Sequence, residues 1–313
     1  MNPIDQFRDA MYQAGITPPA SVDADGLLHR FDVDGDRRNS RNGWYALHLD
    51  GRPAGVFGSW KTGQSEKWTA DGQQLTDGER QRYSELAVAA KAQRKRERLQ
   101  SESQAADFAR NSWRLATPAS AAHPYLLKKA VKPHGLRQQG TGLLVPLVDQ
   151  YGALWSVQTI LAEGTKRFQT GGRIAGTFSP IGDLTSPPTV LICEGWATGA
   201  TLHQETGHLV LCAMNCGNLL AVAKAARAAW ANADLVICAD DDRFTDGNPG
   251  MTKATEAAKA TGARLTYPTF PSGATGTDFN DLAAIRRMTL GDSRARARCG
   301  TETLEEPCGV AHG

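Results

Sequence analysis

The sequence predicts an α/β protein in which a parallel sheet domain follows a β-hairpin, and a long basic helix joins both to a small β-rich module at the amino terminus. Three observations support this prediction. Strand-sized apolar runs alternate with helical segments after residue 188, a charged central stretch has almost no Gly or Pro, and short strand-like runs with turn signals occupy the beginning. With 313 residues, 41% of them hydrophobic, the chain is long enough for about two domains with cores.

The first predicted unit is the β-rich module at residues 1–78. Residues 44–49 form a predicted strand, Asp50-Gly51 signals a turn, and residues 54–60 form a second strand. The module also combines tryptophans with cations and glycines, which suits stacked bases and phosphates. A small antiparallel sheet with its tryptophans in the core explains the same residues equally well, so both interpretations stay open.

A basic helix is predicted within the next segment, residues 79–140. This segment has 13 Lys and Arg against 5 Asp and Glu, a net charge of +8, whereas the whole chain has +2. Residues 79–114 are rich in Ala, Gln, Glu, Arg and Leu, which favour a long helix. The cations that could contact nucleic-acid phosphates are Arg94, Lys95, Arg96 and Arg98. A solvated helix face between two domains is the alternative, and charge alone favours it.

The second predicted unit, residues 141–289, begins with a hairpin. Residues 143–148 and 154–161 are strand-like, and the turn sequence Asp149-Gln150-Tyr151-Gly152 joins them. A loop with cations close to glycines follows, and it contains Lys166, Arg167 and Arg173. These cations could hold nucleotide phosphates or be ordinary surface residues.

A parallel sheet is predicted from four apolar runs with helical segments between them, at residues 189–193, 208–214, 234–238 and 264–267. Continuous apolar runs of this length are typical of strands that are buried on both faces. Their alternation with helices indicates right-handed crossovers. The tail at residues 290–313 is polar, and we expect it to be disordered.

Acidic residues follow these runs at the carboxyl ends of the strands, where ligands bind in such sheets. Glu194 follows the first strand, Asp240 and Asp242 follow the third, and Asp278 and Asp281 lie beyond the fourth. If the first and third strands are neighbours, the side chains gather at one edge. Because Mg²⁺ binds oxygen ligands, usually one or two carboxylates with waters and phosphates, the pattern predicts a divalent metal site for phosphate chemistry. The intervening Asp241 is expected to point away toward solvent.

At these residues the sequence resembles a known family. Glu194-Gly195 and Asp240-x-Asp242, each after a strand, resemble the Toprim domain of bacterial primases, topoisomerases and some nucleases. The stretch Glu194 to Ala200, Glu-Gly-Trp-Ala-Thr-Gly-Ala, is similar to the Glu-Gly-Tyr-Ala-Thr-Gly/Ala motif of primases from phage satellites and conjugative plasmids. The resemblance covers residues 143–284, and residues 44–68 resemble the amino-terminal part of phage primase-helicases. Trp196 departs from the motif because it keeps an aromatic ring but lacks the tyrosine hydroxyl.

The resemblance implies a DNA primase that joins ribonucleotides on single-stranded DNA with Mg²⁺ or Mn²⁺ in phage- or plasmid-type replication. Asp240 and Asp242 would bind the metal with help from Asp278, and Glu194 would be a general base or a further ligand. The residues expected to contact phosphates are Lys166, Arg167, Arg173, Arg243 and Lys253. The implied partners are the template strand, NTPs and a separate replicative helicase.

Two other functions remain open. A Toprim nuclease would use the same carboxylates to activate water, whereas a non-catalytic DNA-binding factor that loads a helicase would not need them. A topoisomerase would need a tyrosine nucleophile on a gate domain, and no segment is large enough for one.

Further expectations come from the cysteines and the apolar runs. The six cysteines include no Cys-x-x-Cys pair, so no zinc site is expected, and Cys193, Cys212 and Cys238 are interpreted as small buried hydrophobic residues. The apolar runs are far shorter than the ~18 residues of a membrane span. Because the start also lacks a signal-peptide pattern, we expect a cytoplasmic protein without membrane contact.

Overall fold

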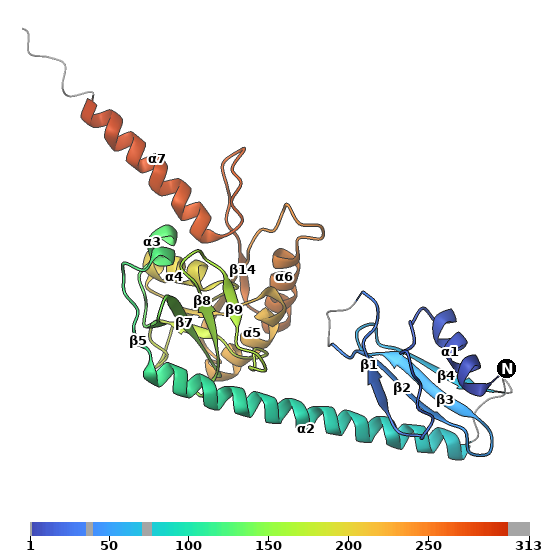
Figure 1. Ribbon diagram of the computed structural model, residues 1–313. Helices are drawn as coiled ribbons and strands as arrows, with labels where there is room; N and C mark the ends of the chain where they lie inside the picture. The colour runs from blue at the N-terminus through green and yellow to red at the C-terminus, as the bar shows by residue number, and fades with distance from the viewer. Residues whose placement is uncertain (1, 36–39, 71–76, 300–313) are drawn as a thin grey trace, which may run out of the picture. The chain divides into compact units, whose positions relative to one another are not determined.

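The computed structural model describes residues 2–35, 40–70 and 77–299 (Figure 1). The chain divides into two compact units, residues 1–99 and 100–313. The boundary falls within one helix, α2 (Asp77–Leu115), which confirms the long basic helix expected from the sequence. The two units are therefore described separately.

The first unit is a four-stranded antiparallel sheet with one helix packed on it. The strand order is β1-β2-β3-β4, and the elements are α1 (Pro3–Gln13), β1 (His29–Phe31), β2 (Gly43–His48), β3 (Ala54–Ser59) and β4 (Gln64–Thr69). Phe7 of α1 is fully buried, and its ring meets those of Phe57 and Trp68 edge-on at 5.5 and 5.4 Å. Trp44 is buried in a second apolar cluster and stacks on Trp60 at 5.7 Å. The tryptophans thus take part in the packing of the sheet, while binding of bases by this unit stays a prediction.

The second unit starts with an antiparallel sheet of order β5-β6-β7-β8-β9. Its elements are β5 (Thr117–Pro118), α3 (Pro124–Lys129), β6 (Arg137–Gln139), β7 (Gly142–Val148), β8 (Leu154–Ile160) and β9 (Lys166–Phe168). The expected hairpin is confirmed, since β7 and β8 pair in antiparallel register. Asp149 closes the turn because its Oδ1 accepts hydrogen bonds from the amides of Tyr151 and Ala153, each at 3.0 Å.

The predicted parallel sheet is also confirmed, with the order β10-β12-β11-β13-β14. Its strands are β10 (Ser179–Ile181), β11 (Thr189–Cys193), β12 (Leu209–Cys212), β13 (Asp234–Cys238) and β14 (Arg264–Thr266). The strands β12, β11, β13 and β14 are parallel, and β10 adds an antiparallel edge. Since β11 lies directly beside β13, the first and third predicted strands are neighbours. This arrangement is required if the acidic residues that follow these strands are to gather at one edge of the sheet.

Helices pack against both faces of this sheet: α4 (Trp196–Thr206) on one face, and α5 (Leu219–Ala229) and α6 (Pro249–Thr261) on the other (Figure 1). The short η1 (Cys216–Asn218) leads into α5, and α7 (Phe279–Cys299) packs against α4. Alternate residues of β11 point to opposite faces: Leu191 packs in the cluster that contains α4 and the hairpin sheet, and Ile192 packs in the cluster beneath α5 and α6. The apolar runs are continuous because both faces are covered.

The end of the chain differs from the expectation of a disordered tail from residue 290. Helix α7 continues past this point to Cys299. It begins with reciprocal side-chain caps at Asp278 and Asp281, and residues 279–299 contain no proline to interrupt the helix. The remainder of that predicted tail, residues 300–313, lies outside the described residues.

Within the described ranges, none of the helices is both long enough and apolar enough to span a bilayer.

Candidate active site

Three thiols lie in a row beneath the acidic edge, the edge of the parallel sheet where Glu194, Asp240, Asp242 and Asp278 gather. Cys212, Cys193 and Cys238 are paired in register on β12, β11 and β13, and all three are buried. Their burial confirms the sequence interpretation. Glu194 and Asp240 follow this row within two residues on β11 and β13, so the register of the sheet brings the first and third acidic loops to the same edge.

Glu194 is held in an environment that opposes its charge. Burial raises the pKa of Glu194, the negative charge of Asp242 adds to this, and Asp278 contributes less. A backbone hydrogen bond from Cys216 and the ammonium of Lys166 act in the opposite direction. A carboxyl group with a raised pKa at a strand end is a candidate for proton transfer.

Asp240 is the most strongly perturbed carboxyl group of the edge. Burial raises the pKa of Asp240 to about 8, with further contributions from Asp278, Glu194 and Asp242, while Lys166 opposes them. Its Oδ1 is buried and has no hydrogen-bond partner among the described residues. A buried carboxylate oxygen without a donor is unfavourable in the ionised state unless a cation compensates it.

Asp242 faces the start of α6. Its Oδ2 accepts a hydrogen bond from the amide of Gly250 at 3.0 Å, where the helix N-terminus favours negative charge. A Cβ at Gly250 would lie 2.8 Å from this oxygen and 2.7 Å from the carbonyl oxygen of Asp240. The close approach of the helix to the acidic loop therefore requires glycine at this position.

Asp278 and Asp281 form the start of α7. The Asp281 amide donates to Oδ1 of Asp278 at 2.9 Å, and Oδ2 of Asp281 accepts from the Thr277 amide at 3.2 Å. Asp281 also pairs with Lys129 at 3.6 Å. Asp281 is thus engaged in capping the helix, whereas Asp278 lies close enough to Asp240 and Glu194 to influence both carboxyl groups.

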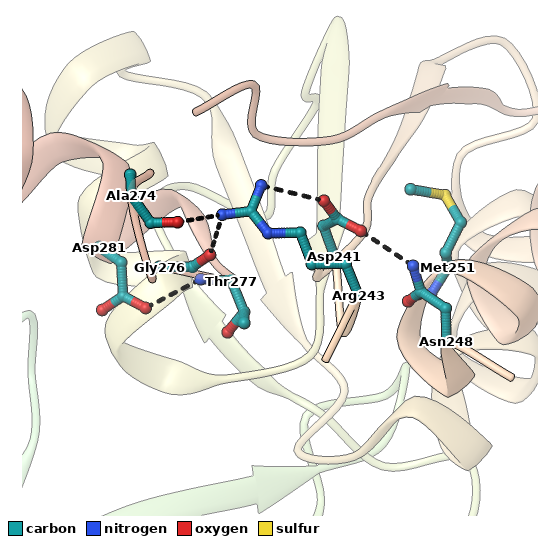
Figure 2. Close-up of polar contacts among 8 residues, drawn as sticks. All are labelled: Asp241, Arg243, Asn248, Met251, Ala274, Gly276, Thr277 and Asp281. Atoms are coloured by element: carbon teal, nitrogen blue, oxygen red, sulfur yellow. Dashed lines mark hydrogen bonds and ion pairs between the residues drawn. The ribbon is translucent and has the colours of Figure 1, made fainter. Parts of the chain in front are cut away.

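Asp241 points away from these acids, but not into solvent. Its side chain is 17% exposed, accepts a hydrogen bond from Asn248 Nδ2 at 2.9 Å and pairs with Arg243 at 3.7 Å (Figure 2). The expectation that Asp241 faces solvent is wrong because the turn before α6 and the side chain of Arg243 enclose it.

The cations expected to contact phosphates lie in different environments. Lys166 is near the acidic edge, since its charge lowers the pKa of both Glu194 and Asp240. Arg173 lies over the ring of Trp155 at 4.7 Å. Lys253 pairs with Glu256 at 2.9 Å on the surface of α6.

The remaining predicted cations lie elsewhere. Arg167 is an exposed residue of β9, and its charge contributes to a lowered pKa of Glu163, chiefly caused by hydrogen bonds at Glu163 and Thr165. Lys95, Arg96 and Arg98 are exposed on α2 in the first unit, while the side chain of Arg94 lies outside the described residues.

Three further residues outside the predicted site set lie at or near the site. Cys216 supplies the backbone hydrogen bond to Glu194. The buried Asn218 amide donates to three carbonyl oxygens and ties residues 174–177 to the end of β12. Burial and then the charge of Asp278 raise the pKa of the Tyr125 hydroxyl to about 12, so α3 also approaches this edge. Cys216 and Tyr125 meet partners that are distant in sequence, so local patterns do not reveal these contacts.

The donor set of the edge suits a hard cation, although it does not form a closed cage. Over residues 2–35, 40–70 and 77–299, no three His, Cys, Asp or Glu side chains are grouped closely enough to hold a metal ion. Mg²⁺ needs fewer protein ligands, because it commonly uses one or two carboxylates and completes its shell with waters and phosphates. The unpartnered oxygen of Asp240 and the nearby carboxylates fit such an open site.

Comparison with known proteins gives matches at family, sequence and fold level. Residues 189–287 match the Toprim domain family. Two relatives, both DNA primase TraC from Escherichia coli, are 37% identical over 287 residues and 34% identical over 300 residues. These alignments cover 87% and 91% of this chain but 27% and 21% of the relatives, so the chain spans less than a third of their length.

Among solved structures, the primase fragment of the bacteriophage T7 primase-helicase protein matches with a TM-score of 0.40 and 11% identity, covering 54% of this chain and 73% of that one. The DnaG catalytic core matches with a TM-score of 0.39 and 14% identity, covering 64% and 79%.

Proposed function

We propose that this chain, which carries a Toprim domain at residues 189–287, is a DNA primase that synthesises short RNA primers on single-stranded DNA. The similarity to two relatives named DNA primase over most of this chain supports the proposal. The chain spans only part of those relatives, so their activity alone does not establish the activity of this chain. The proposal therefore also depends on the residues at the acidic edge.

The observation that carries the proposal is the environment of Asp240. Its unpartnered buried oxygen lies among Glu194, Asp242 and Asp278, whose charges raise the pKa of Asp240 after burial has already done so. A divalent cation would stabilise a site where neighbouring negative charges raise the pKa of both Asp240 and Glu194. In this proposal Asp240 and Asp242 hold Mg²⁺ or Mn²⁺ and Asp278 assists.

The bound cation would neutralise charge on the triphosphate of the incoming nucleotide and would help to align the reacting oxygens. The raised pKa of Glu194 brings it closer to the working pH, which suits acceptance of the proton from the attacking 3′-hydroxyl. Lys166, whose charge already reaches Asp240 and Glu194, is the cation that we assign to the phosphates. Arg167, Arg173 and Lys253 are further phosphate contacts under the same proposal.

The proposed partners follow from this reaction. They are a single-stranded DNA template, NTPs and a separate replicative helicase, and a protein with these partners would work in the cytoplasm. The exposed cations of α2 and the aromatic first unit would contact the template through phosphates and bases.

The test is incubation of the purified full chain with single-stranded DNA, labelled NTPs and either Mg²⁺ or Mn²⁺, with Asp240→Asn as the matched control. We expect oligoribonucleotides from the unsubstituted protein and none from the variant. Metal-dependent cleavage of the DNA without oligoribonucleotides would instead identify a nuclease. Retention of DNA binding and of replication in cells by both Asp240→Asn and Glu194→Gln would indicate a non-catalytic loading factor.

A further inference from the structure

Arg243 makes several contacts with protein groups beside the acidic edge, although part of its side chain is exposed (Figure 2). Its Nη2 donates to the carbonyl oxygens of Ala274 at 2.8 Å and Gly276 at 3.0 Å, and its Nη1 lies 3.7 Å from Asp241. Its guanidinium also lies over the rings of Phe244 and Phe270, at 5.0 and 4.7 Å from their centroids. These contacts place the planar group between the loop after β13 and the loop before α7.

Asp241 extends this contact in two directions. Its carboxylate accepts a hydrogen bond from Asn248, the residue that caps α6, at 2.9 Å. Its backbone amide donates to the carbonyl oxygen of Thr277 at 2.8 Å. Asp241 and Arg243 therefore join the start of α6, the end of β13 and the loop at residues 274–277.

The same loop sets the position of Asp278. Thr277 donates its amide to Asp281, and Asp281 donates its amide to Asp278. The loop is irregular, since the part of the chain between β14 and α7 has no helix or strand. The side-chain contacts of Arg243 and the amide of Asp241 thus tie a segment without regular structure to the end of β13.

Asp278 lies at the end of this irregular loop. Its charge acts on both Asp240 and Glu194, which places it near these two groups. Without helix or strand hydrogen bonds in the loop, the position of Asp278 depends on the contacts that hold the loop. A guanidinium that binds two carbonyl oxygens and stacks on two rings restrains the loop, and an ammonium cannot reproduce both contacts.

We propose that Arg243 is a positioning residue that holds Asp278 at the metal edge, in place of the phosphate contact suggested by its sequence position. The inference rests on the proposed function, because it gives Asp278 a role toward the cation. The inference and simple electrostatics predict opposite changes in the affinity for a divalent cation. Removal of a positive charge near the site should by itself strengthen cation binding, whereas loss of the positioning of Asp278 should weaken it.

The test measures binding of Mn²⁺ to the full chain without nucleotides, by electron paramagnetic resonance, and of Mg²⁺ by competition. Arg243→Lys keeps the charge but loses the planar fork, and Arg243→Gln loses both. We expect each variant to bind Mn²⁺ about 10-fold more weakly, as is typical when a residue that orients a ligand is lost. In an Asp278→Asn background, the same changes at Arg243 should have almost no further effect.

Circular dichroism and thermal melting establish that each variant is folded, and Arg243→Lys keeps the test usable if Arg243→Gln is not. Unchanged or tighter Mn²⁺ binding by a folded Arg243→Lys protein would overturn the inference, and so would an equal loss of affinity in the Asp278→Asn background. If the unsubstituted protein makes primers while Arg243→Lys only raises the KM for NTPs, Arg243 is a phosphate contact and the proposed function stands. If the unsubstituted protein binds neither metal, both proposals are wrong.

Discussion

Gly199 lies where helix α4 meets the row of thiols, and its replacement by alanine tests how closely the helix must approach. A Cβ at Gly199 would lie 3.2 Å from the sulfur of Cys193, 3.3 Å from Cγ1 of Val210, and closer still to the sulfur of Cys212. The thiols of Cys193 and Cys212 are fully buried, so the Cys212 side chain, α4 or β12 must shift to make room for the methyl group.

The expected size of the effect follows from two opposing contributions. Alanine is better than glycine inside a helix by about 1 kcal/mol. Overpacking of a closed core costs typically 1–3 kcal/mol, and the approach to Cys212 places Gly199→Ala at the upper end. We therefore expect the variant to lose about 2 kcal/mol of unfolding free energy, although helix propensity alone predicts a gain.

Urea denaturation of the full chain, followed by circular dichroism, measures this change. Cys212→Ala removes the sulfur that meets the new methyl group, so Gly199→Ala with Cys212→Ala should be more stable than the sum of the two single effects predicts. Because α4 begins next to Glu194, the proposed function predicts that Gly199→Ala also lowers primer synthesis and that Cys212→Ala restores part of it. A stabilised Gly199→Ala protein, or additive effects in the double variant, would refute the packing argument.

Three other predictions concern the acidic edge and the loop beside it. Burial raises the pKa of Asp240 to about 8 from an ordinary 3.8, so between about pH 4 and pH 8 this carboxyl group binds a proton more strongly in the folded protein than in the unfolded chain. Its contribution to stability is therefore lost as the pH rises through this range. Asp240→Asn, melted in metal-free buffer, should remove this contribution, and an unchanged dependence of stability on pH would contradict the burial of this group. Lys166→Ala removes a charge that lowers the pKa of Asp240 and Glu194. Under the proposed function, the pH profile of primer synthesis should therefore move to higher pH, and a profile that does not move would place Lys166 outside the site. Asn218→Ala removes the side-chain donor of the buried Thr177 and Ala213 carbonyl oxygens and should cost about 1–3 kcal/mol of unfolding free energy in urea denaturation. Asn218→Asp keeps the shape but cannot donate, so it should cost as much. A fully stable Asn218→Asp protein would show that these hydrogen bonds contribute little.

The parallel sheet could be predicted because its signal is local. Each buried strand is a continuous apolar run, and each acid comes directly after such a run, so the topology of parallel strands brings Glu194 and Asp240 to one edge. Asp240 and Asp242 are two residues apart, with Asp241 between them, so the sequence pattern assigns them to the site and leaves Asp241 out of it. The sequence therefore predicts which strand ends meet, although it does not predict how far each side chain reaches.

The role of the polar residues around the acids could not be predicted in the same way. Arg243 donates hydrogen bonds to the carbonyl oxygens of Ala274 and Gly276, which lie about thirty residues further along the chain. The sequence near Arg243 contains no pattern that predicts these backbone partners. Tyr125 approaches Asp278 from a helix outside the parallel sheet. The enclosure of Asp241 depends on the turn before α6, where the αL backbone of Asn248 directs its side chain to both Asp241 and Met251.

The three thiols under the acidic edge bear on how the proposed metal site would exchange ions with solvent. Burial raises the pKa of Asp240, and the thiols below it are weak hydrogen-bond donors that give its anion little stabilisation. A divalent ion that binds there would compete with a proton for this carboxyl group. Uptake of the ion would therefore release protons, and alkaline conditions would favour it.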